Sequence, residues 1–222
     1  MADAPMIGQV VSVNVGTPRT VRWHDRDVTT AIWKYPVTGR RPVRDVNVDG
    51  DDQADRRVHG GPTKALYAYS VEDYRWWSEQ LGRDLHPGTF GENLTTAGLD
   101  PAAAVVGERW AIGTATLRVT EPRIPCFKLG IRMGDAGFVE RFAAAARPGT
   151  YLAIEREGDI GPGDTIVRLD QPAGTSLTVG DVERAYHGHI ELLPALVESR
   201  ELSEAWRSWA SRRLRRSTER VS

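Results

Sequence analysis

The chain has 222 residues, of which 40% are hydrophobic and 27% are charged, and its formal net charge is −1 at pH 7. This length is enough to bury a sizeable core, and the composition is that of an ordinary soluble globular protein. The near-zero net charge gives no long-range field that favours nucleic acid or a membrane surface as a partner. The sequence shows no apolar run as long as a membrane span and no signal segment, and with one cysteine we expect a cytoplasmic, reducing location.

The first part of the chain is predicted to form mainly β-strands. Three segments have the alternation or the β-branched composition of strands, namely residues 7–15, 21–34 and 43–48. In the first of them, Val11, Val13 and Val15 are expected to share one face. The second contains a polar turn near residues 24–27, and the highly charged stretch 49–57 is predicted to be a loop.

A short strand and the first helix follow this loop. Residues 65–69 are apolar and predict a strand, and Ser70 is then suited to be the N-cap of a helix because Asp73 follows three residues later. Gly82 is expected to end this helix just after Leu81. Its buried face is expected to contain Tyr74, Trp77 and Leu81.

Two β-hairpins are predicted in the middle of the chain, after a loop or short strand at residues 89–94. The first joins residues 105–112 to 114–120 at Gly113, and the second joins residues 151–155 to 165–169 through a glycine-rich turn. Between the hairpins, residues 135–146 are predicted to be helical, since apolar side chains recur there at helical spacing: Phe138, Val139, Phe142 and Ala146.

The pattern changes near residue 171, and beyond it the sequence contains only helix signals. Thr178 is the predicted N-cap of a helix that buries Val179, Val182 and Tyr186, a second helix holds the leucines around Pro194, and Ser203 begins a third. We therefore expect a β-dominated domain over residues 1–172 and a three-helix appendage over residues 173–222. The arginines at its end are interpreted as a solvated tail.

Several common site types lack their residue pattern in this sequence. There is no GxxxxGK[ST] phosphate loop, no GxSxG nucleophile motif to accompany His59-Gly60-Gly61, and no HExxH zinc motif. The aspartates between residues 49 and 55 lack the glycine and the closing glutamate of a calcium loop. His187 and His189 are interpreted as a helix junction in preference to half of a metal site.

Cys126 is the single cysteine, and it lies within the segment Pro122–Leu129. Two prolines precede it and restrict the backbone, and the cationic side chains of Arg123 and Lys128 lie on either side of it in the sequence. A lone thiol cannot form an internal disulfide. It can be a small buried apolar group, a nucleophile, or one protein ligand to a metal that a cofactor carries. The sequence around the cysteine alone leaves these three possibilities open.

Four segments, in this order, resemble the motifs of MOSC domains, a family named after the C-terminal domain of molybdenum cofactor sulfurase. They are Ile32–Val37 (IWKYPV), His59–Ala65 (HGGPTKA), Pro87–Leu94 (PGTFGENL) and Glu121–Leu129 (EPRIPCFKL). The resemblance covers roughly residues 7–170. The helical region that follows resembles the one appended in the bacterial YiiM-like branch of the family.

This resemblance implies a closed, mixed β-barrel of the pyruvate-kinase-like type, followed by a small helical domain. It also implies binding of the molybdenum cofactor, a molybdopterin-type group, with Cys126 as the catalytic residue and the metal ligand. The implied cofactor-binding residues are Lys34, His59, Gly60, Gly61, Phe90, Gly91, Glu92, Asn93, Leu94, Arg123 and Pro125. The implied activity is the reduction of N-hydroxylated compounds, including hydroxylamino base analogues, as a detoxification reaction.

The residues themselves suit such a cofactor. Thiolate is a soft ligand for molybdenum, and Arg123 and Lys128 lie close enough in sequence to favour the charged form of the thiol. Gly60 and Gly61 would let backbone amides approach a phosphate, and Asn93 offers a donor and an acceptor to a pterin edge. The structural alternatives are turns at the glycines, a buried backbone partner for Asn93, and ion pairs for Lys34 and Arg123.

A chain with one cysteine has no ligand set for an iron–sulfur cluster, so we expect electrons from a separate flavin or iron–sulfur protein. The other expected partner is a small N-hydroxylated substrate, with no nucleic acid or membrane, and the chain is expected to be a monomer or homodimer. Two other functions remain open: a sulfur carrier or transferase with a persulfide on Cys126, and a non-catalytic module that binds an anion or cofactor.

Overall fold

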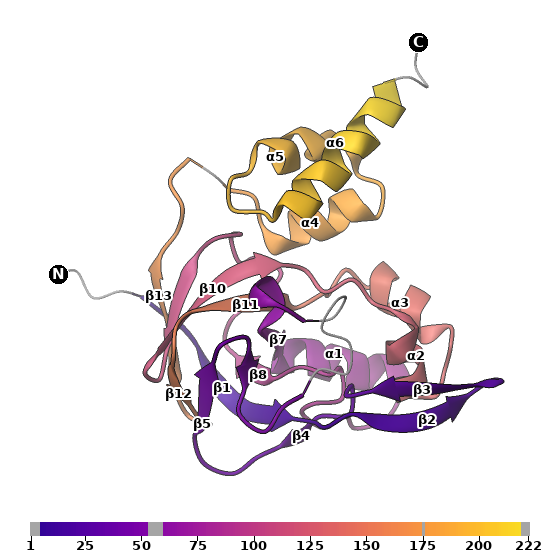
Figure 1. Ribbon diagram of the computed structural model, residues 1–222, viewed down its shortest axis with the longest axis vertical. Helices are drawn as coiled ribbons and strands as arrows, with labels where there is room; N and C mark the ends of the chain where they lie inside the picture. The colour runs from indigo at the N-terminus through magenta and orange to yellow at the C-terminus, as the bar shows by residue number, and fades with distance from the viewer. Residues whose placement is uncertain (1–4, 53–59, 175, 219–222) are drawn as a thin grey trace.

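A closed ring of seven strands forms the centre of the molecule (Figure 1). The computed structural model describes residues 5–52, 60–174 and 176–218. The strands follow the order β13–β9–β10–β11–β7–β8–β1, and β1 pairs back with β13 to close the ring. Only β7 and β8 pair in parallel among these neighbours, so the sheet is mixed. The strands are β1 (Met6–Val15), β7 (Leu66–Ser70), β8 (Leu94–Ala97), β9 (Arg109–Ile112), β10 (Ala115–Glu121), β11 (Thr150–Arg156) and β13 (Thr165–Asp170). The predicted closed, mixed β-barrel is confirmed.

Smaller strands extend the barrel. β2 (Arg19–Trp23) and β3 (Arg26–Thr30) form a hairpin around the polar turn predicted near residues 24–27, and Figure 1 shows it reaching out from the barrel. β4 (Tyr35–Pro36) pairs with the end of β1. A three-stranded sheet contains β5 (Arg41–Arg44), β6 (Asn47–Val48) and β12 (Gly158–Ile160).

The predicted hairpin between residues 151–155 and 165–169 is wrong. β11 pairs with β10 and β7, whereas β13 pairs with β9 and β1 on the other side of the ring. The connecting segment explains the difference, because it contains β12, which pairs with β5 and so leads the chain away from β11. The hairpin at Gly113, between β9 and β10, is confirmed.

The first strand departs from simple alternation. Val11 is 42% exposed, whereas Val10 and Val13 are buried in the barrel core. The pairing of β1 with β8 shifts its register between Val10 and Ser12, so the side chains on either side of this bulge follow different faces. The prediction that Val11 and Val13 share a face is therefore wrong.

Three helices cover one side of the barrel: α1 (Val71–Leu81), α2 (Phe127–Met133) and α3 (Phe138–Ala144). Ser70 caps α1 as predicted, since its Oγ accepts a hydrogen bond of 3.1 Å from the amide of Asp73. The short helix α2 was not predicted from the sequence. The helices enclose an aromatic core beside the barrel, which contains Tyr69, Tyr74, Trp77, Phe90, Phe138 and Phe142.

Three further helices pack together at the end of the molecule (Figure 1), and they are α4 (Val179–Tyr186), α5 (Leu193–Glu198) and α6 (Glu204–Thr218). Thr178 and Asp181 form the predicted capping box of α4. Tyr186 is 39% exposed, so its predicted burial is wrong: it is the last residue of α4 and faces an open groove. His187 ends α4 and His189 precedes the short 3-10 helix η2 (Ile190–Leu192), which is the expected helix junction.

The helical region is joined to the barrel by backbone and side-chain contacts. The amide of Val106 donates to the carbonyl of Leu177, and the amide of Val179 donates to the carbonyl of Ala104, each at 2.9 Å. The buried apolar side chains of the helices belong to the same core cluster as those of the barrel. The division into two domains at residue 172 stays a prediction. Within the described ranges, no helix is long and apolar enough to cross a membrane.

Candidate functional site

A pocket opens beside Cys126. It brings together residues from all four sequence motifs, which lie far apart along the chain. The predicted site residues that line it are Lys34, Gly91, Asn93, Arg123 and Cys126. Its other walls include Ile32, Asp52, Lys64, Tyr67, Lys128 and Tyr151.

Cys126 is half-buried, and it is the residue that immediately precedes α2. Its extended backbone conformation follows Pro125, and its carbonyl accepts a hydrogen bond of 2.9 Å from the amide of Leu129, in the first turn of the helix. The thiol is thus attached to a segment restricted by a proline on one side and by a helix on the other. Such a segment holds the sulfur in a defined position.

Arg123 is a buried residue in the wall of the pocket. Its Nη1 donates a hydrogen bond of 2.8 Å to the carbonyl of Phe90, and its Cζ lies 5.3 Å from the centre of the Tyr67 ring. Burial alone would lower the pKa of Arg123. The combined electrostatic effect of Tyr67, Tyr151 and Cys126 is larger, so the pKa of Arg123 is raised. Arg123 is therefore a permanent positive charge in the neighbourhood of the thiol.

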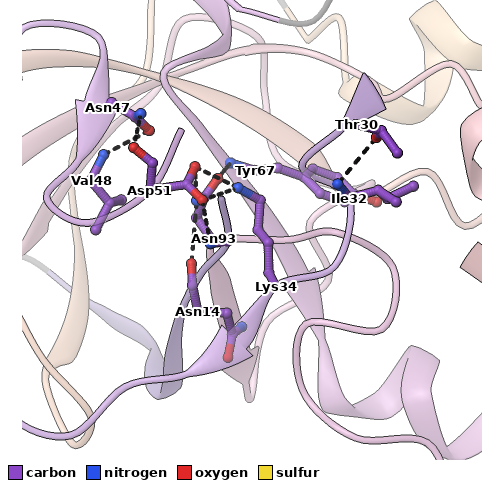
Figure 2. Close-up of polar contacts among 10 residues, drawn as sticks. Asn14, Thr30, Ile32, Lys34, Asn47, Val48, Asp51, Tyr67 and Asn93 are labelled. Carbon is purple, nitrogen blue, oxygen red and sulfur yellow. Dashed lines mark hydrogen bonds and ion pairs between the residues drawn. The ribbon is translucent and has the colours of Figure 1, made fainter. Parts of the chain in front are cut away.

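A second buried charge, Lys34, lies at another wall of the pocket (Figure 2). Its Nζ is bonded to both carboxylate oxygens of Asp51, whose side chain is completely buried. The backbone amide of Gly16 also donates to Asp51, at 2.8 Å. Burial lowers the pKa of Lys34, and the nearby carboxylate of Asp51 opposes that change.

Asn93 connects this ion pair to the barrel (Figure 2). Its Nδ2 donates to Asp51 at 3.0 Å and to the carbonyl of Asn14 at 3.3 Å, and its Oδ1 accepts from the amide of Tyr67 at 3.2 Å. Both ends of the amide are thus engaged within the protein. These contacts match the structural alternative, in which the side chain of Asn93 forms hydrogen bonds with buried polar groups of the protein. The role of Asn93 as a hydrogen-bond donor to the cofactor stays a prediction.

Three predicted residues of the same motif lie behind the pocket and do not line it. Phe90 belongs to the aromatic core and Leu94 to the barrel core. Glu92 is fully buried, and its Oε1 accepts hydrogen bonds from the Tyr74 hydroxyl, the Gly88 amide and the Thr95 hydroxyl at 2.6, 2.6 and 2.8 Å. Burial raises the pKa of this carboxyl. Glu92 therefore organises the loop from within, and its role in binding the cofactor stays a prediction.

Two glycines in this motif allow it to lie directly against the segment that carries Lys34. Gly88 has a φ of 85°, and a Cβ built there would lie 2.3 Å from the carbonyl oxygen of Lys34. Gly91 has a φ of 79°, and its Cβ would lie 3.0 Å from Cγ1 of Ile32. A side chain at Gly88 would displace the backbone of Lys34, so this close contact determines where the lysine lies.

Described residues of the HGGPTKA motif line the pocket and a neighbouring groove, and the role of the motif in cofactor binding stays a prediction. His59 lies outside the described residues, while Gly60 lines a neighbouring groove together with Pro125. Gly61, with a φ of 97°, starts the short 3-10 helix η1 (Pro62–Lys64), and open space surrounds the position of its missing Cβ. This turn places Lys64 at the pocket, with its Nζ 3.7 Å from Oε2 of Glu121.

The sequence-based prediction missed several residues of the site. Lys64 is the lysine of the second motif, so the motif itself held the signal. Asp51 was considered only as a calcium ligand, and its contacts with Lys34, Asn93 and Gly16 now give it a different role. Over the residues that the structure describes, no group of three or more His, Cys, Asp or Glu side chains is arranged to hold a metal ion.

Tyr67 and Tyr151 also line the pocket. Both lie within strands, and nothing in the sequence distinguishes them from other strand residues as part of a site. The hydroxyl of Tyr67 donates to the carbonyl of Pro148 at 2.8 Å. Burial raises the pKa of Tyr151 to about 12, so this hydroxyl keeps its proton at neutral pH.

The charge of the pocket is positive. Its lining contains the cations Lys34, Lys64, Arg123 and Lys128, and the carboxylate of Asp52. Such a lining favours a ligand with negative charge, for instance one with a phosphate group. The thiol of Cys126, in the same lining, adds a soft donor for a transition metal.

The chain belongs to the MOSC domain family. The family model matches residues 55–167, which contain the cysteine and two of the other three motifs. The chain is 33% identical over 202 residues to the uncharacterized protein YflK of Bacillus subtilis, and the match covers 90% of this chain and 91% of YflK. Membership of the family, predicted from the motifs, is thereby confirmed.

Two other proteins extend the comparison. The crystal structure of YiiM from Geobacillus stearothermophilus superimposes with a TM-score of 0.76 at 29% identity, covering 93% of this chain and 99% of that one, so the fold is that of YiiM as expected. A protein of Gibberella moniliformis named "Reductase" is 32% identical over 173 residues. That match covers 75% of this chain, which spans only 31% of the fungal protein's length.

Proposed function

We propose that this protein is a molybdenum-cofactor-dependent oxidoreductase that reduces N-hydroxylated compounds in the reducing cytoplasm. The observation that carries the proposal is the combination of one thiol and four cationic side chains around a single pocket. A thiolate is a suitable ligand for molybdenum, and the cations suit the phosphate and the polar pterin of the cofactor. Sequence similarity to a protein named as a reductase supports the type of reaction.

The residues of the pocket fit such a group. Cys126 would provide the sulfur ligand, while Lys64, Arg123 and Lys128 would face its negative charge. The molybdenum centre, when bound, would supply the two-electron redox chemistry. The remaining tasks belong to the protein, which must hold the thiolate, orient the substrate and provide protons.

Reduction of a hydroxylamine to an amine breaks the N–O bond, consumes two electrons and two protons, and releases water. Lys34 is a suitable source of a proton within the site, because burial lowers its pKa and Asp51 holds its ammonium group in place. The chain has one cysteine, which is too few to ligate an iron–sulfur cluster, so the electrons are proposed to come from a flavin or iron–sulfur protein.

The proposal can be tested by turnover with an artificial electron donor. Protein purified from a host that makes the cofactor should convert a hydroxylamino base analogue to the amine when supplied with reduced methyl viologen. Cys126→Ser should remove this activity, while the unfolding temperature should stay close to that of the wild type because the side chains have nearly the same size. Equal turnover by the variant and the wild type would disprove the proposed role of the thiol.

A sulfur-carrier function is a second candidate, and the position of Cys126 is the observation that favours it. The thiol lines both the cationic pocket and a second groove, so a sulfur atom on it can be reached from two sides. In that case, intact mass spectrometry should show an extra sulfur on Cys126 that cyanide removes. The same preparation should contain no molybdenum, which separates the two functions.

A further inference from the structure

A second groove adjoins the pocket at Cys126. The walls of the two depressions share Lys64, Ile124, Cys126 and Tyr151, so the depressions adjoin at the thiol. The groove runs between the barrel and the helical region, and its far wall comes from α4 and α6. None of the predicted site residues belongs to this helical wall.

The helical wall is aromatic. Tyr186 from α4 and Trp206 and Trp209 from α6 lie in mutual contact, with ring centres 5.4 to 5.9 Å apart. The rings of Tyr186 and Trp209 are inclined by only 30° to one another, and Tyr186 remains 39% exposed. The groove therefore presents an aromatic surface that a ligand can reach, unlike a buried core cluster.

Polar contacts fix one of these rings against the barrel. Nε1 of Trp206 donates a hydrogen bond of 2.7 Å to Oε2 of Glu121, a buried residue at the end of β10. The same oxygen lies 3.7 Å from Nζ of Lys64. Since Glu121 immediately precedes the cysteine segment, this contact sets the aromatic wall in a fixed relation to Cys126.

The two depressions also differ in charge. The pocket contains Arg123 and Lys128, together with Lys34 in its ion pair with Asp51, and the groove contains none of these cations. Lys64, beside Glu121, lines both depressions. An anionic ligand is thus favoured in the pocket, and an uncharged planar one is favoured in the groove. Aromatic side chains bind flat rings by offset stacking or edge-to-face contact.

We propose that the groove binds the planar heteroaromatic ring of the substrate, stacked against Tyr186 and Trp209, with the ring's substituent directed to the reacting centre at Cys126. This inference rests on the proposed function and deepens it by assigning the recognition of the substrate to the helical region. Saturated rings of similar size should bind poorly in the groove, because they cannot stack on these aromatic side chains.

Binding to the cofactor-free protein tests the inference without any turnover. Adenine serves as the planar probe and cyclohexanecarboxamide as the neutral, saturated control, with tryptophan fluorescence and calorimetry as readouts. Adenine should bind saturably, and Tyr186→Ala and Trp209→Ala should each raise its Kd by about tenfold, the scale expected for loss of one stacking ring. Ile190→Ala, at an exposed position that lines neither depression, should leave the Kd unchanged.

A further variant separates stacking from hydrogen bonding. Trp206→Phe keeps an aromatic ring in the wall but removes the donor to Glu121, and it should bind adenine within about threefold of the wild type, since the aromatic surface that adenine contacts is retained. Circular dichroism of each variant shows whether the helices are retained. Equal affinity for adenine and cyclohexanecarboxamide, or an unchanged Kd in both folded alanine variants, would overturn the inference.

The cofactor-loaded protein distinguishes a failure of this inference from a failure of the proposed function. Tyr186→Ala should keep its molybdenum and raise KM for a planar substrate with little change in kcat. Normal molybdenum content with an unchanged KM would overturn only the role of the groove. Adenine binding that depends on Tyr186 and Trp209, in a wild-type protein that lacks molybdenum, would support the groove and reject the proposed function.

Discussion

At the scale of single residues, Asp51 determines the polar wall of the pocket. Its buried carboxylate is bonded to Lys34, Asn93 and the amide of Gly16, and so connects three segments of the chain. A buried ammonium group without a counter-ion is strongly unfavourable, so Lys34 depends on this partner. Lys34 therefore keeps its charge beside the proposed cofactor only because it is paired with Asp51, which lies outside the recognised motifs.

Asp51→Asn should destabilise the folded protein by about 3–5 kcal/mol at pH 7, because it leaves the charge of Lys34 buried and uncompensated. Urea unfolding measures this change. Asp49→Asn, at an exposed position two residues away, is the matched control and should change the free energy of unfolding very little. A double variant, Lys34→Met with Asp51→Leu, should recover much of the stability but not the binding of the cofactor.

An unchanged urea midpoint for Asp51→Asn would show that the ion pair is not important for stability. A double variant as unstable as Asp51→Asn alone would show that the loss is one of packing and not of charge.

A pH dependence is expected from Glu183 in α4, whose side chain is 5% exposed and lies 3.5 Å from Nε2 of His187. Burial raises its pKa from 4.5 to about 7. Between these pH values the folded chain keeps a proton that the unfolded chain has lost. The free energy of unfolding should therefore fall as the pH rises from about 4.5 to about 7, and stay at the lower value above that range.

Glu183→Gln should remove this dependence, making the variant more stable than the wild type at pH 8 by on the order of 2 kcal/mol and about equal to it near pH 4.5. Urea titrations at several pH values measure the difference between the two proteins, which cancels the contribution of most other groups. Glu198→Gln, at an exposed position, is the control. A constant difference at all pH values would contradict the assignment to Glu183.

At the scale of elements, the segment 87–94 positions the site by lying against residues 32–34. Gly88 and Gly91 have positive φ and leave room for the neighbouring backbone and for Ile32. Glu92 accepts the amide of Gly88 and so closes the turn from within. The motif therefore shapes the pocket mainly through its backbone conformation, since few of its side chains line the pocket.

Gly88→Ala and Gly82→Ala form a matched pair, because both glycines have positive φ but only Gly88 has backbone atoms where its Cβ would lie. Gly82→Ala should cost about 1–2 kcal/mol, the general penalty of the left-handed conformation. Gly88→Ala should cost clearly more and should also weaken cofactor binding, because the methyl group would collide with the carbonyl of Lys34. Thermal unfolding and molybdenum content measure the two effects, and equal losses in the two variants would disprove the proposed contact.

Local signals explain which of these elements the sequence predicts correctly. The N-cap at Ser70 and the capping box at Thr178 specify α1 and α4, and Gly113 specifies the hairpin of β9 and β10. Pairing between distant strands has no local signal, so the separation of β11 from β13 could not be predicted. The same is true of Asp51, whose role depends on residues that are distant in sequence.

At the scale of the whole molecule, the barrel and the C-terminal helices share one apolar core. Leu177, Val179 and Val182 belong to the same buried cluster as Val106 and Trp110 of the barrel part. The hydrogen bond from Trp206 to Glu121 connects the two parts next to the cysteine segment. The helical region is thus placed to take part in the site, which the resemblance alone did not indicate.

A shared core predicts that the two parts unfold together. Far-ultraviolet circular dichroism reports on all helices, and tryptophan fluorescence includes Trp110 inside the barrel. The two signals should give coincident transitions in urea, as for a single cooperative unit. Two separated transitions would indicate that residues 173–222 form an independent domain, as the sequence alone had suggested.

The central claim is that Cys126 ligates molybdenum in the cationic pocket, and the metal content of two proteins tests it most directly. Wild type and Cys126→Ser should be purified in parallel from a host that makes the cofactor and assayed for molybdenum per chain. We expect close to one molybdenum in the wild type, given a single thiol ligand per chain, and a large loss in the variant. Molybdenum near zero in the wild type, or equal amounts in the two proteins, would contradict the account.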